Sequence, residues 1–446
     1  MTWPQVLMML CQCMAGFTDI WVGGHIGPEV QASLSLVVQC FFFMMVVGMT
    51  MANASVASIS QALGAGKPWR AKRYLGMLIS LGAVFCLFIL LLGYVFRQQF
   101  LNILLVPAEI HELSSRLWVI FLASMPSQYA VAFSSAAFRA HKRVLIPLCA
   151  SVIIFMANLI LDFGLGLGYF GLPNLEAEGL ALATFISITF GAIFNFYMLH
   201  RLGYLRRKSF APIRWYKNAI GYFIKVAIPA GGMQLSWQLG YLVLMAITAS
   251  LPRDSVNSVA GLGTGMRIES ILFLPAVAFS MTGSVLVGHC LGAGNKKEAK
   301  RVGLKVLLVA CGSMSLVAAC MWPWVEKIAA FMSPKSAEVQ LLAITYIRYN
   351  IFSTPFTIGS MVLGGILTGA GATIYPFIVY SGAIWIIRLP MAWYLGHISW
   401  GHASGIFCAM LVSQIIQCSI IFYVFMKRNW SRFSMNSAKQ RRPVKA

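Results

Sequence analysis

The stretch QALGAGKPWRAKR at residues 61–73 recurs about half a chain later as HCLGAGNKKEAKR at residues 289–301. Each copy follows a long apolar run, turns at closely spaced glycines and continues into basic residues. Pro147 and Pro376 extend the match, because they occupy corresponding places in two further apolar runs. Self-similarity over half a chain indicates two related halves. We therefore expect two lobes that follow one pattern.

The composition around these two copies is that of a membrane protein. Of 446 residues, 59% are hydrophobic and 10% are charged, whereas a soluble domain has about 25% charged residues. Apolar runs long enough to cross a bilayer, about 20 residues each, recur along the whole chain. The predicted fold is an all-α polytopic membrane protein with twelve transmembrane helices in two pseudo-symmetric six-helix lobes. The approximate spans are 4–24, 33–62, 76–96, 117–137, 144–168, 178–200, 222–250, 257–288, 303–325, 341–368, 374–397 and 402–426.

The net charge of +22 is distributed unevenly between the two sides of this bundle. Basic residues fill the even-numbered connections and the tail, whereas the first and fifth connections contain acidic residues and no basic ones. By the positive-inside rule, both termini lie in the cytoplasm. We expect a multi-pass protein of the cell (inner) membrane, with membrane lipids and no nucleic acid among its partners.

Repeat and charge together divide the chain into four segments. They are an N-terminal six-helix lobe at 1–200, a cytoplasmic linker at 201–221, a C-terminal six-helix lobe at 222–426 and a basic cytoplasmic tail at 427–446. An even number of spans separates the two copies, so the lobes have the same orientation, as in many secondary transporters. Residues 1–24 lack the basic start of a signal peptide. They enter the first span at once, so we expect a few natural residues to precede this start.

The glycine-rich segments do not have the pattern of nucleotide-binding loops. Gly64-Ala65-Gly66-Lys67 is followed by Pro68, where a phosphate loop needs a hydroxyl residue. The stretch GLGTG at 261–265 lacks the third glycine of a dinucleotide fingerprint. We therefore expect neither ATP hydrolysis nor a bound cofactor, and we interpret the LGAG turns as C-terminal caps of helices.

These segments resemble the multidrug and toxic compound extrusion (MATE) family. Its LGAGN pattern before a basic helix is matched at 288–295 and more loosely at 61–66. Its first-span aspartate before a glycine-rich turn is matched by FTDIWVGGHIG at 17–27, and its eleventh-span Arg-x-Pro by Arg388-Leu389-Pro390. The resemblance covers nearly the whole chain. It implies a cation-coupled (Na⁺ or H⁺) antiporter that exports small organic compounds, cationic or amphipathic, by alternating access; we expect a monomer.

Polar residues interrupt several spans at one depth. Asn158 and Asp162 lie one helical turn apart in IIFMANLILDFGLGLG, residues 153–168, although a carboxylate at a membrane helix centre costs about 2.5–3.5 kcal/mol. At 1.5 Å per residue, both lie within roughly 8–15 Å of the outer surface, as do Asp19 and Thr184. Oxygen ligands suit a hard cation, and a carboxylate pair shielded from water can also carry a proton.

Hydrogen bonding between helices, worth about 0.6 kcal/mol per contact, is the alternative interpretation. We favour simple hydrogen bonding between helices for Asn158 alone or Thr184 alone. For Asp19 together with Asp162 we favour a function, because two acids are a costly way to join apolar helices. In the DinF-like branch of the MATE family, a first-span aspartate, a fifth-span Asn-x-x-x-Asp and a sixth-span threonine form a cation site. The resemblance thus assigns sodium or proton binding to Asp19, Asn158 and Asp162, and less directly to Thr184.

The second half departs from the NorM-like branch, which has a glutamate in span seven and an aspartate after span ten. Here span seven has Gln234 and Gln238, and Ala372 replaces the aspartate. Instead, this lobe carries Glu269 in span eight and Arg388 in span eleven, both expected near mid-depth. We expect them to form a buried pair, which is costly to break. For Glu269, Arg388, Gln234 and Gln238, structural and substrate-contacting roles both stay open.

The sequence gives two other functions less support than export. A flippase for lipid-linked sugars or another lipid needs a basic cavity for pyrophosphate, and the spans offer few cationic groups beyond Arg267 and Arg388. An embedded lipid-modifying enzyme needs a His/Asp or Cys/His set at a plausible spacing, and the sequence has none. We predict a transporter and not an enzyme.

Overall fold

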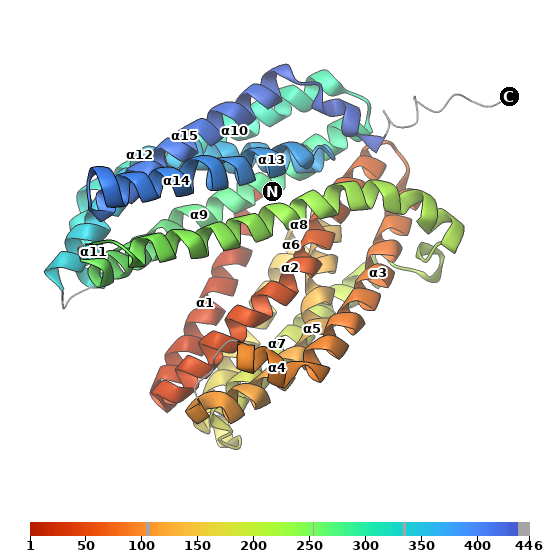
Figure 1. Cartoon of the computed structure of the whole chain (residues 1–446). Coiled ribbons are helices and arrows are strands. Elements are labelled where there is room, and N and C mark those ends of the chain that lie inside the picture. Colours follow the sequence, from red (N-terminus) through yellow and green to blue (C-terminus); the bar gives the residue numbers. More distant parts are fainter. Residues whose placement is uncertain (104–107, 253, 333–335, 436–446) are drawn as a thin grey trace. The chain divides into compact units, whose positions relative to one another are not determined.

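The computed structural model describes residues 1–103, 108–252, 254–332 and 336–435, and within them the long elements are all helices (Figure 1). The tail beyond residue 435 lies outside this description. The long helices of the first half are α1 (Thr2–Ile26), α2 (Pro28–Gly64), α3 (Pro68–Val95), α5 (Ala108–Ala140), α6 (Leu145–Leu161) and α7 (Glu176–Arg201). A π-helical turn, η1 (Asp162–Gly166), continues α6, and α4 (Arg97–Ile103), η2 (Tyr169–Gly171) and η3 (Arg207–Ser209) are short.

The second half repeats this order. Its long helices are α8 (Ile213–Ala249), α9 (Ser255–Gly292), α10 (Lys296–Met321), α12 (Ala337–Gly369) and α15 (Ala403–Lys427). One further long helix consists of α13 (Ile374–Gly382), the π-helical η5 (Ala383–Arg388), α14 (Leu389–Trp393) and the π-helical η6 (Tyr394–Ser399). The short elements are η4 (Trp322–Trp324), α11 (Val325–Met332) and η7 (Trp430–Phe433).

The helices confirm the predicted fold class. Eleven helices of the described residues are long and apolar enough to cross a membrane. The helix α8 is not among them, and its sequence includes the polar residues Gln234 and Gln238. Because α8 is as long as α2 and occupies the place of the seventh predicted span, it completes the set of twelve.

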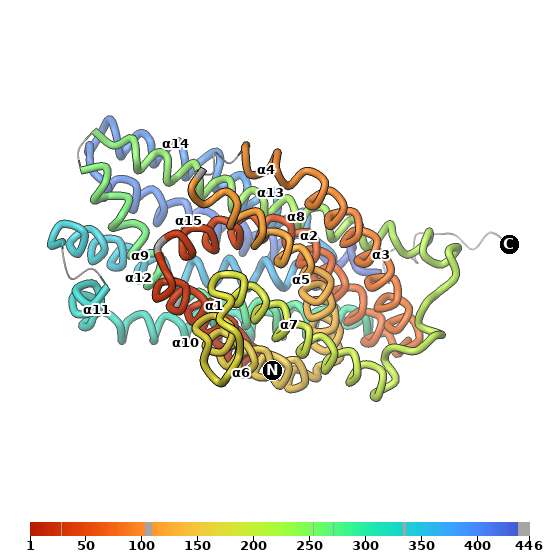
Figure 2. The backbone as a smooth tube through the Cα atoms, turned by 90° about the horizontal axis from the view of Figure 1, so that it is seen from below, coloured from red at the N-terminus to blue at the C-terminus, as the bar shows by residue number. Residues whose placement is uncertain are grey.

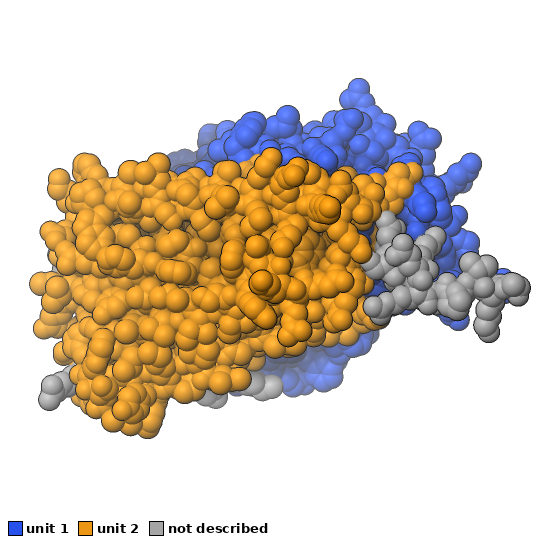
Figure 3. Space-filling view, turned by 90° about the horizontal axis from the view of Figure 1, so that it is seen from above, with its two compact units in different colours: residues 1, 3–63, 67–223 blue, residues 2, 64–66, 224–446 orange. Residues whose placement is uncertain are grey.

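The chain forms two compact units, coloured separately in Figure 3. Apart from a few residues near Met1 and Gly64, the first unit ends at Phe223 and the second begins at Ile224. The boundary therefore falls inside α8. Residues 213–221, which we expected in the linker, are the first turns of this helix.

Small residues allow the helices of the first unit to approach closely. Within it α7 packs against α5 and α6, and α5 packs against α3 (Figure 2). Gly82 of α3 lies against the ring of Phe133 on α5, and Gly191 of α7 lies against Ile154 on α6. In a bilayer, packing at small residues is a main source of helix association.

The helix α12 is the centre of the second unit, where it packs against α9, α10 and α15. A Cβ atom added to Gly365 would lie 2.1 Å from Ser280 Oγ, and one added to Gly369 would lie 2.1 Å from the Ser284 carbonyl oxygen, both on α9. The two glycines are one turn apart, so they form a small-xxx-small face. This face sets the distance between α9 and α12.

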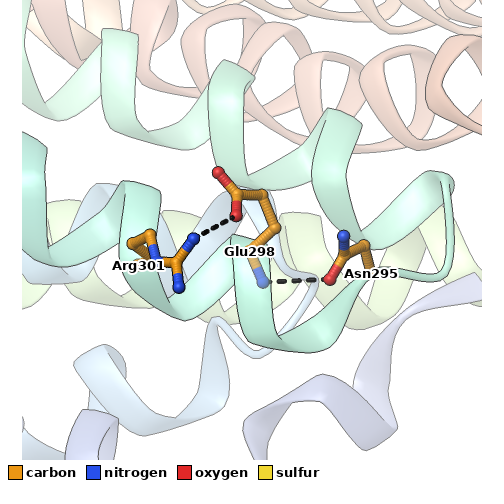
Figure 4. Close-up of polar contacts among 3 residues, drawn as sticks. All are labelled: Asn295, Glu298 and Arg301. Carbon is orange, nitrogen blue, oxygen red and sulfur yellow. Dashed lines mark hydrogen bonds and ion pairs between the residues drawn. The ribbon is translucent and has the colours of Figure 1, made fainter.

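The LGAG turns cap their helices, as predicted from the sequence. The left-handed residues are Gly66 after α2, with φ of 67°, and Gly294 after α9, with φ of 81°. Glycine is the usual residue at this position because it has no Cβ. The following helices begin differently: Pro68 starts α3, whereas Asn295 Oδ1 accepts the Glu298 amide at 3.0 Å and caps α10 (Figure 4).

Candidate cation site of the first unit

The local backbone of span five places Asp162 at a change of helical winding. The helix α6 ends at Leu161, and Asp162 is the first residue of the π-helical turn η1. Gly166 of this turn lies against Val22 of α1 and Leu180 of α7, and a Cβ on Gly179 would lie 2.2 Å from the Leu165 carbonyl oxygen. Short π-helical turns are frequent at functional sites. Here the glycines bring α1, η1 and α7 together around the acid.

One amide connects the two acids of the first unit. Asn158 Nδ2 donates to Oδ1 of Asp19 at 3.3 Å and to Oδ1 of Asp162 at 3.2 Å. The carboxyl groups of Asp19 and Asp162 also lie close enough to interact directly. The structure therefore brings together three of the four residues that the sequence predicted for this site.

Two oxygen atoms of this cluster meet no hydrogen-bond donor. They are Asn158 Oδ1 and Asp162 Oδ2, and both are buried. The side chain of Asp162 is 0% exposed and that of Asn158 is 2% exposed, while Asp19 is half-buried. A buried polar atom without a partner costs about 1–3 kcal/mol. Carboxylate and amide oxygens are the ligands that hard cations prefer, so this donor set fits a small cation.

Thr184 does not join the cluster through a hydrogen bond. It lies on α7, which packs against α6 and η1, and its Oγ1 donates to the Leu180 carbonyl oxygen at 3.1 Å within its own helix. The hydroxyl oxygen keeps capacity to accept or to ligate. Its predicted role as a cation ligand stays a prediction.

The two charged residues expected to pair in the second unit make no direct ion pair. Glu269 of α9 accepts a hydrogen bond from the Tyr346 hydroxyl of α12, whereas Arg388 Nε donates to Ser413 Oγ of α15 at 2.8 Å. The ion pairs of the described residues include neither Glu269 nor Arg388. Glu269 and Arg388 therefore form no direct ion pair; each bonds a different neighbour, and the two charges are close enough to interact electrostatically.

Arg388 is nevertheless deeply buried, with 6% of its surface exposed. Its guanidinium lies 5.8 Å from the centre of the Trp237 ring, a distance at which a cation is attracted to the aromatic face. Nη2 has no hydrogen-bond partner. Gln234 and Gln238 are half-buried on the same helix as Trp237, and no hydrogen bond of the described side chains includes them.

A small hollow of about 20 Å³ opens between α9, α12 and α15 within the second unit. It is lined by Glu269, Tyr346, Tyr349, Asn350, Ser353, Thr357, Phe407, Met410, Leu411 and Gln414. Sequence reasoning identified Glu269 alone in this set. Asn350 and Gln414 also interrupt apolar runs, and that signal could have found them.

These features define a class of protein: a multi-pass helical membrane protein built from two repeated halves, with a cluster of two acids and an amide in the first. The MatE family matches residues 4–163 and 229–394, one region in each half. The chain belongs to this family. Its members are transporters, so the chain is a transporter and not an enzyme, as predicted.

Individual relatives agree over nearly the full length. A probable multidrug resistance protein NorM of Thermotoga maritima is 24% identical over 425 residues, which cover 94% of this chain and 90% of the relative. Protein DETOXIFICATION 39 of Arabidopsis thaliana is 24% identical over 441 residues, 96% of this chain and 83% of the relative. The fold is similar to that of the Vibrio cholerae MATE transporter VcmN, with a TM-score of 0.87, 21% identity and 96% of both chains covered. A MOP superfamily transporter of Pyrococcus furiosus also has a TM-score of 0.87, with 18% identity, 97% of this chain and 95% of that chain.

Proposed function

We propose that this chain is a cation-coupled antiporter that exports small organic compounds, cationic or amphipathic, by alternating access. The relatives named as multidrug resistance proteins support the export of such compounds. The observation that carries the coupling is the Asn158 bridge, which holds two acids from α1 and span five together and leaves two buried oxygens without donors.

The coupling follows from what a cation changes at this bridge. A cation that enters from outside is bound by oxygens of Asp19, Asn158 and Asp162, and it neutralises charge that the apolar helices otherwise exclude. The Asn158 amide then exchanges part of its bonding with the two acids, so the contact between α1 and span five is altered. The coupling cation drives transport only through its different affinity for the two states of the protein.

The hollow of the second unit is proposed as a substrate contact. Its lining combines the carboxyl group of Glu269 with the aromatic rings of Tyr346, Tyr349 and Phe407, a combination that attracts organic cations. No lysine or arginine is among the residues that line it, and this gives a pyrophosphate-bearing lipid substrate no support. Arg388, Gln234 and Gln238 are proposed to hold the surrounding helices or to contact substrate.

The finer identity and the topology belong to the same proposal. The Asp19, Asn158 and Asp162 cluster favours the DinF-like branch. The basic connections favour a protein of the cell (inner) membrane with both termini in the cytoplasm. We propose a working monomer, with no cofactor other than the transported cation.

Flux measurements with purified protein in proteoliposomes test this function. A fluorescent organic cation is added on one side of the proteoliposome membrane. A sodium gradient and a proton gradient are then imposed in separate experiments. We expect accumulation against the concentration gradient of the compound with at least one of the two ions. Flux that ignores both gradients, or flux that depends on added nucleotide, would contradict the proposal.

A further inference from the structure

A basic hollow lies in the first unit where α7 ends and the chain turns towards α8. It is lined by His200, Arg201, Leu205, Arg206, Arg207 and Phe210, has a volume of about 660 Å³ and is open to the outside. The three arginines and the histidine are exposed. Neither cation coupling nor the proposed substrate contact uses this feature.

The loop that carries these arginines is fixed in place. Ser209 is 1% exposed; its Oγ accepts the Arg206 amide at 3.0 Å and donates to the Tyr204 carbonyl oxygen at 3.2 Å. The Tyr204 ring stacks on that of His141, the residue after α5, with 3.9 Å between the ring centres. A Cβ on Gly76 of α3 would lie 2.3 Å from the Ser209 carbonyl oxygen, so the loop rests directly on that helix. The arginines are therefore presented by an ordered surface.

The positive charge of this surface has no counterion among the residues that the structure describes. The sequence has no acidic residue between Glu29 and Glu109, and none between Glu178 and Asp254. The ion pairs of the described residues leave out Arg201, Arg206 and Arg207. The corresponding basic cluster of the second half differs, because Glu298 lies within it and pairs with Arg301 at 3.4 Å (Figure 4).

Exposed apolar side chains border the same surface. Phe210 is 47% exposed and Ile213 is 73% exposed. Near them the Arg73 guanidinium lies 5.0 Å from the Trp69 ring and 6.0 Å from the Trp215 ring. Aromatic and cationic residues in this combination are typical of the level where lipid headgroups meet acyl chains. The ligand expected here thus has both a negative headgroup and an apolar part.

We propose that this hollow binds the phosphate headgroup of an anionic phospholipid in the cytoplasmic leaflet. The acyl chains lie along Phe210 and Ile213. Guanidinium groups bind phosphate through paired hydrogen bonds, and three of them favour a headgroup with two phosphates over a headgroup with one. The inference rests on the proposed orientation of the chain and is independent of the coupling cation.

Lipid binding by the full-length protein in detergent tests the inference. The probe is a fluorescent diphosphatidylglycerol, and the variant is Arg201→Gln with Arg207→Gln. Each basic residue near a lipid surface contributes about 1 kcal/mol, so we expect the dissociation constant to rise about 30-fold. The matched control, Lys296→Gln with Lys297→Gln, removes two exposed charges from the second half and is expected to change binding by less than twofold.

Further arms of the experiment separate this site from its alternatives. Arg201→Lys with Arg207→Lys keeps the charge but loses the paired hydrogen bonds, so binding should fall between that of the wild type and that of the glutamine variant. Inorganic phosphate and pyrophosphate at matched phosphate concentration should not displace the probe; displacement would assign the hollow to a soluble phosphate. The proposal would be overturned if Arg201→Gln with Arg207→Gln weakened binding no more than the control Lys296→Gln with Lys297→Gln does, or if neither pair of substitutions weakened it. Binding is measured without a gradient, so a failure of cation coupling does not affect it.

Discussion

The side-chain nitrogen of Asn158 lies 3.2 Å from Oδ1 of Asp162, one turn along the same span, and 3.3 Å from Oδ1 of Asp19 on α1. A single amide thus holds two acids that come from different helices. The remaining oxygens of Asn158 and Asp162 are buried without donors. A carboxylate in an apolar span costs free energy. Binding of a cation at this site would explain why the chain keeps two of them.

The first prediction concerns Asp162→Asn. The amide is close in size to the carboxylate, so we expect normal insertion and an unchanged elution profile. Gradient-driven export should fall to less than about a tenth of the wild-type rate, because the charge that binds the cation is lost. Proteoliposome flux measures this. The control is Glu29→Gln, an exposed acid outside the cluster, which should transport normally. Wild-type rates in both Asp19→Asn and Asp162→Asn would show that the site is misplaced.

A second prediction distinguishes the actual partner of Glu269 from the expected one. Double-mutant cycles combine Glu269→Gln first with Tyr346→Phe and then with Arg388→Gln. A hydrogen bond to a charged group contributes about 1.5–3 kcal/mol, so the coupling with Tyr346 should be near this range. The coupling with Arg388, which binds Ser413, should be clearly smaller. Free energies of unfolding in mild detergent give both values. The reverse order would restore the ion pair predicted from the sequence.

The cluster around Asn158 was predictable from the sequence, whereas the contacts of Glu269 were not. Hydropathy located the spans, and span direction placed Asp19, Asn158 and Asp162 at one depth, because depth depends only on residue count along a helix. The partner of Glu269 depends on the rotation of α9 about its own axis. In helices that are apolar on all sides, no hydrophobic face fixes that rotation. The π-helical turn at Asp162 also has no sequence signal, although it sets the direction of the acid.

Packing between α9 and α12 gives the third prediction. Gly369→Ala adds a Cβ atom only 2.1 Å from the Ser284 carbonyl oxygen, which is too close for an ordinary contact. We expect a loss of about 1–3 kcal/mol in the free energy of unfolding, because overpacking forces the helices apart. Gly312→Ala on α10 is the control, since a Cβ there meets no atom within 4 Å. Equal stability of the two variants would exclude a tight contact at Gly369.

The proposed orientation predicts which connections react from which side. Single cysteines replace Lys208, Arg432 and Pro173 in a chain whose ten native cysteines have been removed. Membrane-impermeant maleimide should reach Pro173→Cys in intact cells, and Lys208→Cys and Arg432→Cys only after lysis, because the basic connections lie inside. Labelling of Lys208→Cys in intact cells would reverse the topology, and with it the leaflet assigned to the bound lipid.

The last prediction concerns the identity of the coupling cation. A proton needs only one carboxyl group, whereas a sodium ion needs a shell of oxygens. Asp19, Asn158 and Asp162 supply several, and Asn158 Oδ1 has no donor. A neutral amide oxygen helps a metal ion more than it helps a proton. We therefore predict sodium binding with proton competition, so that lowering the pH raises the sodium concentration needed for half-maximal transport.

Two substitutions separate the ions. Asn158→Leu removes an oxygen and the bridge between the acids, so sodium-stimulated flux should disappear while part of any proton-driven flux remains. Thr184→Val should weaken sodium stimulation only if its hydroxyl, now bonded to Leu180, turns towards the ion; Thr184→Ser is the control. Flux is measured at fixed pH with choline in place of sodium. Undiminished transport without sodium would leave the proton as the sole driver, and Asn158 would then serve only to hold α1 against span five.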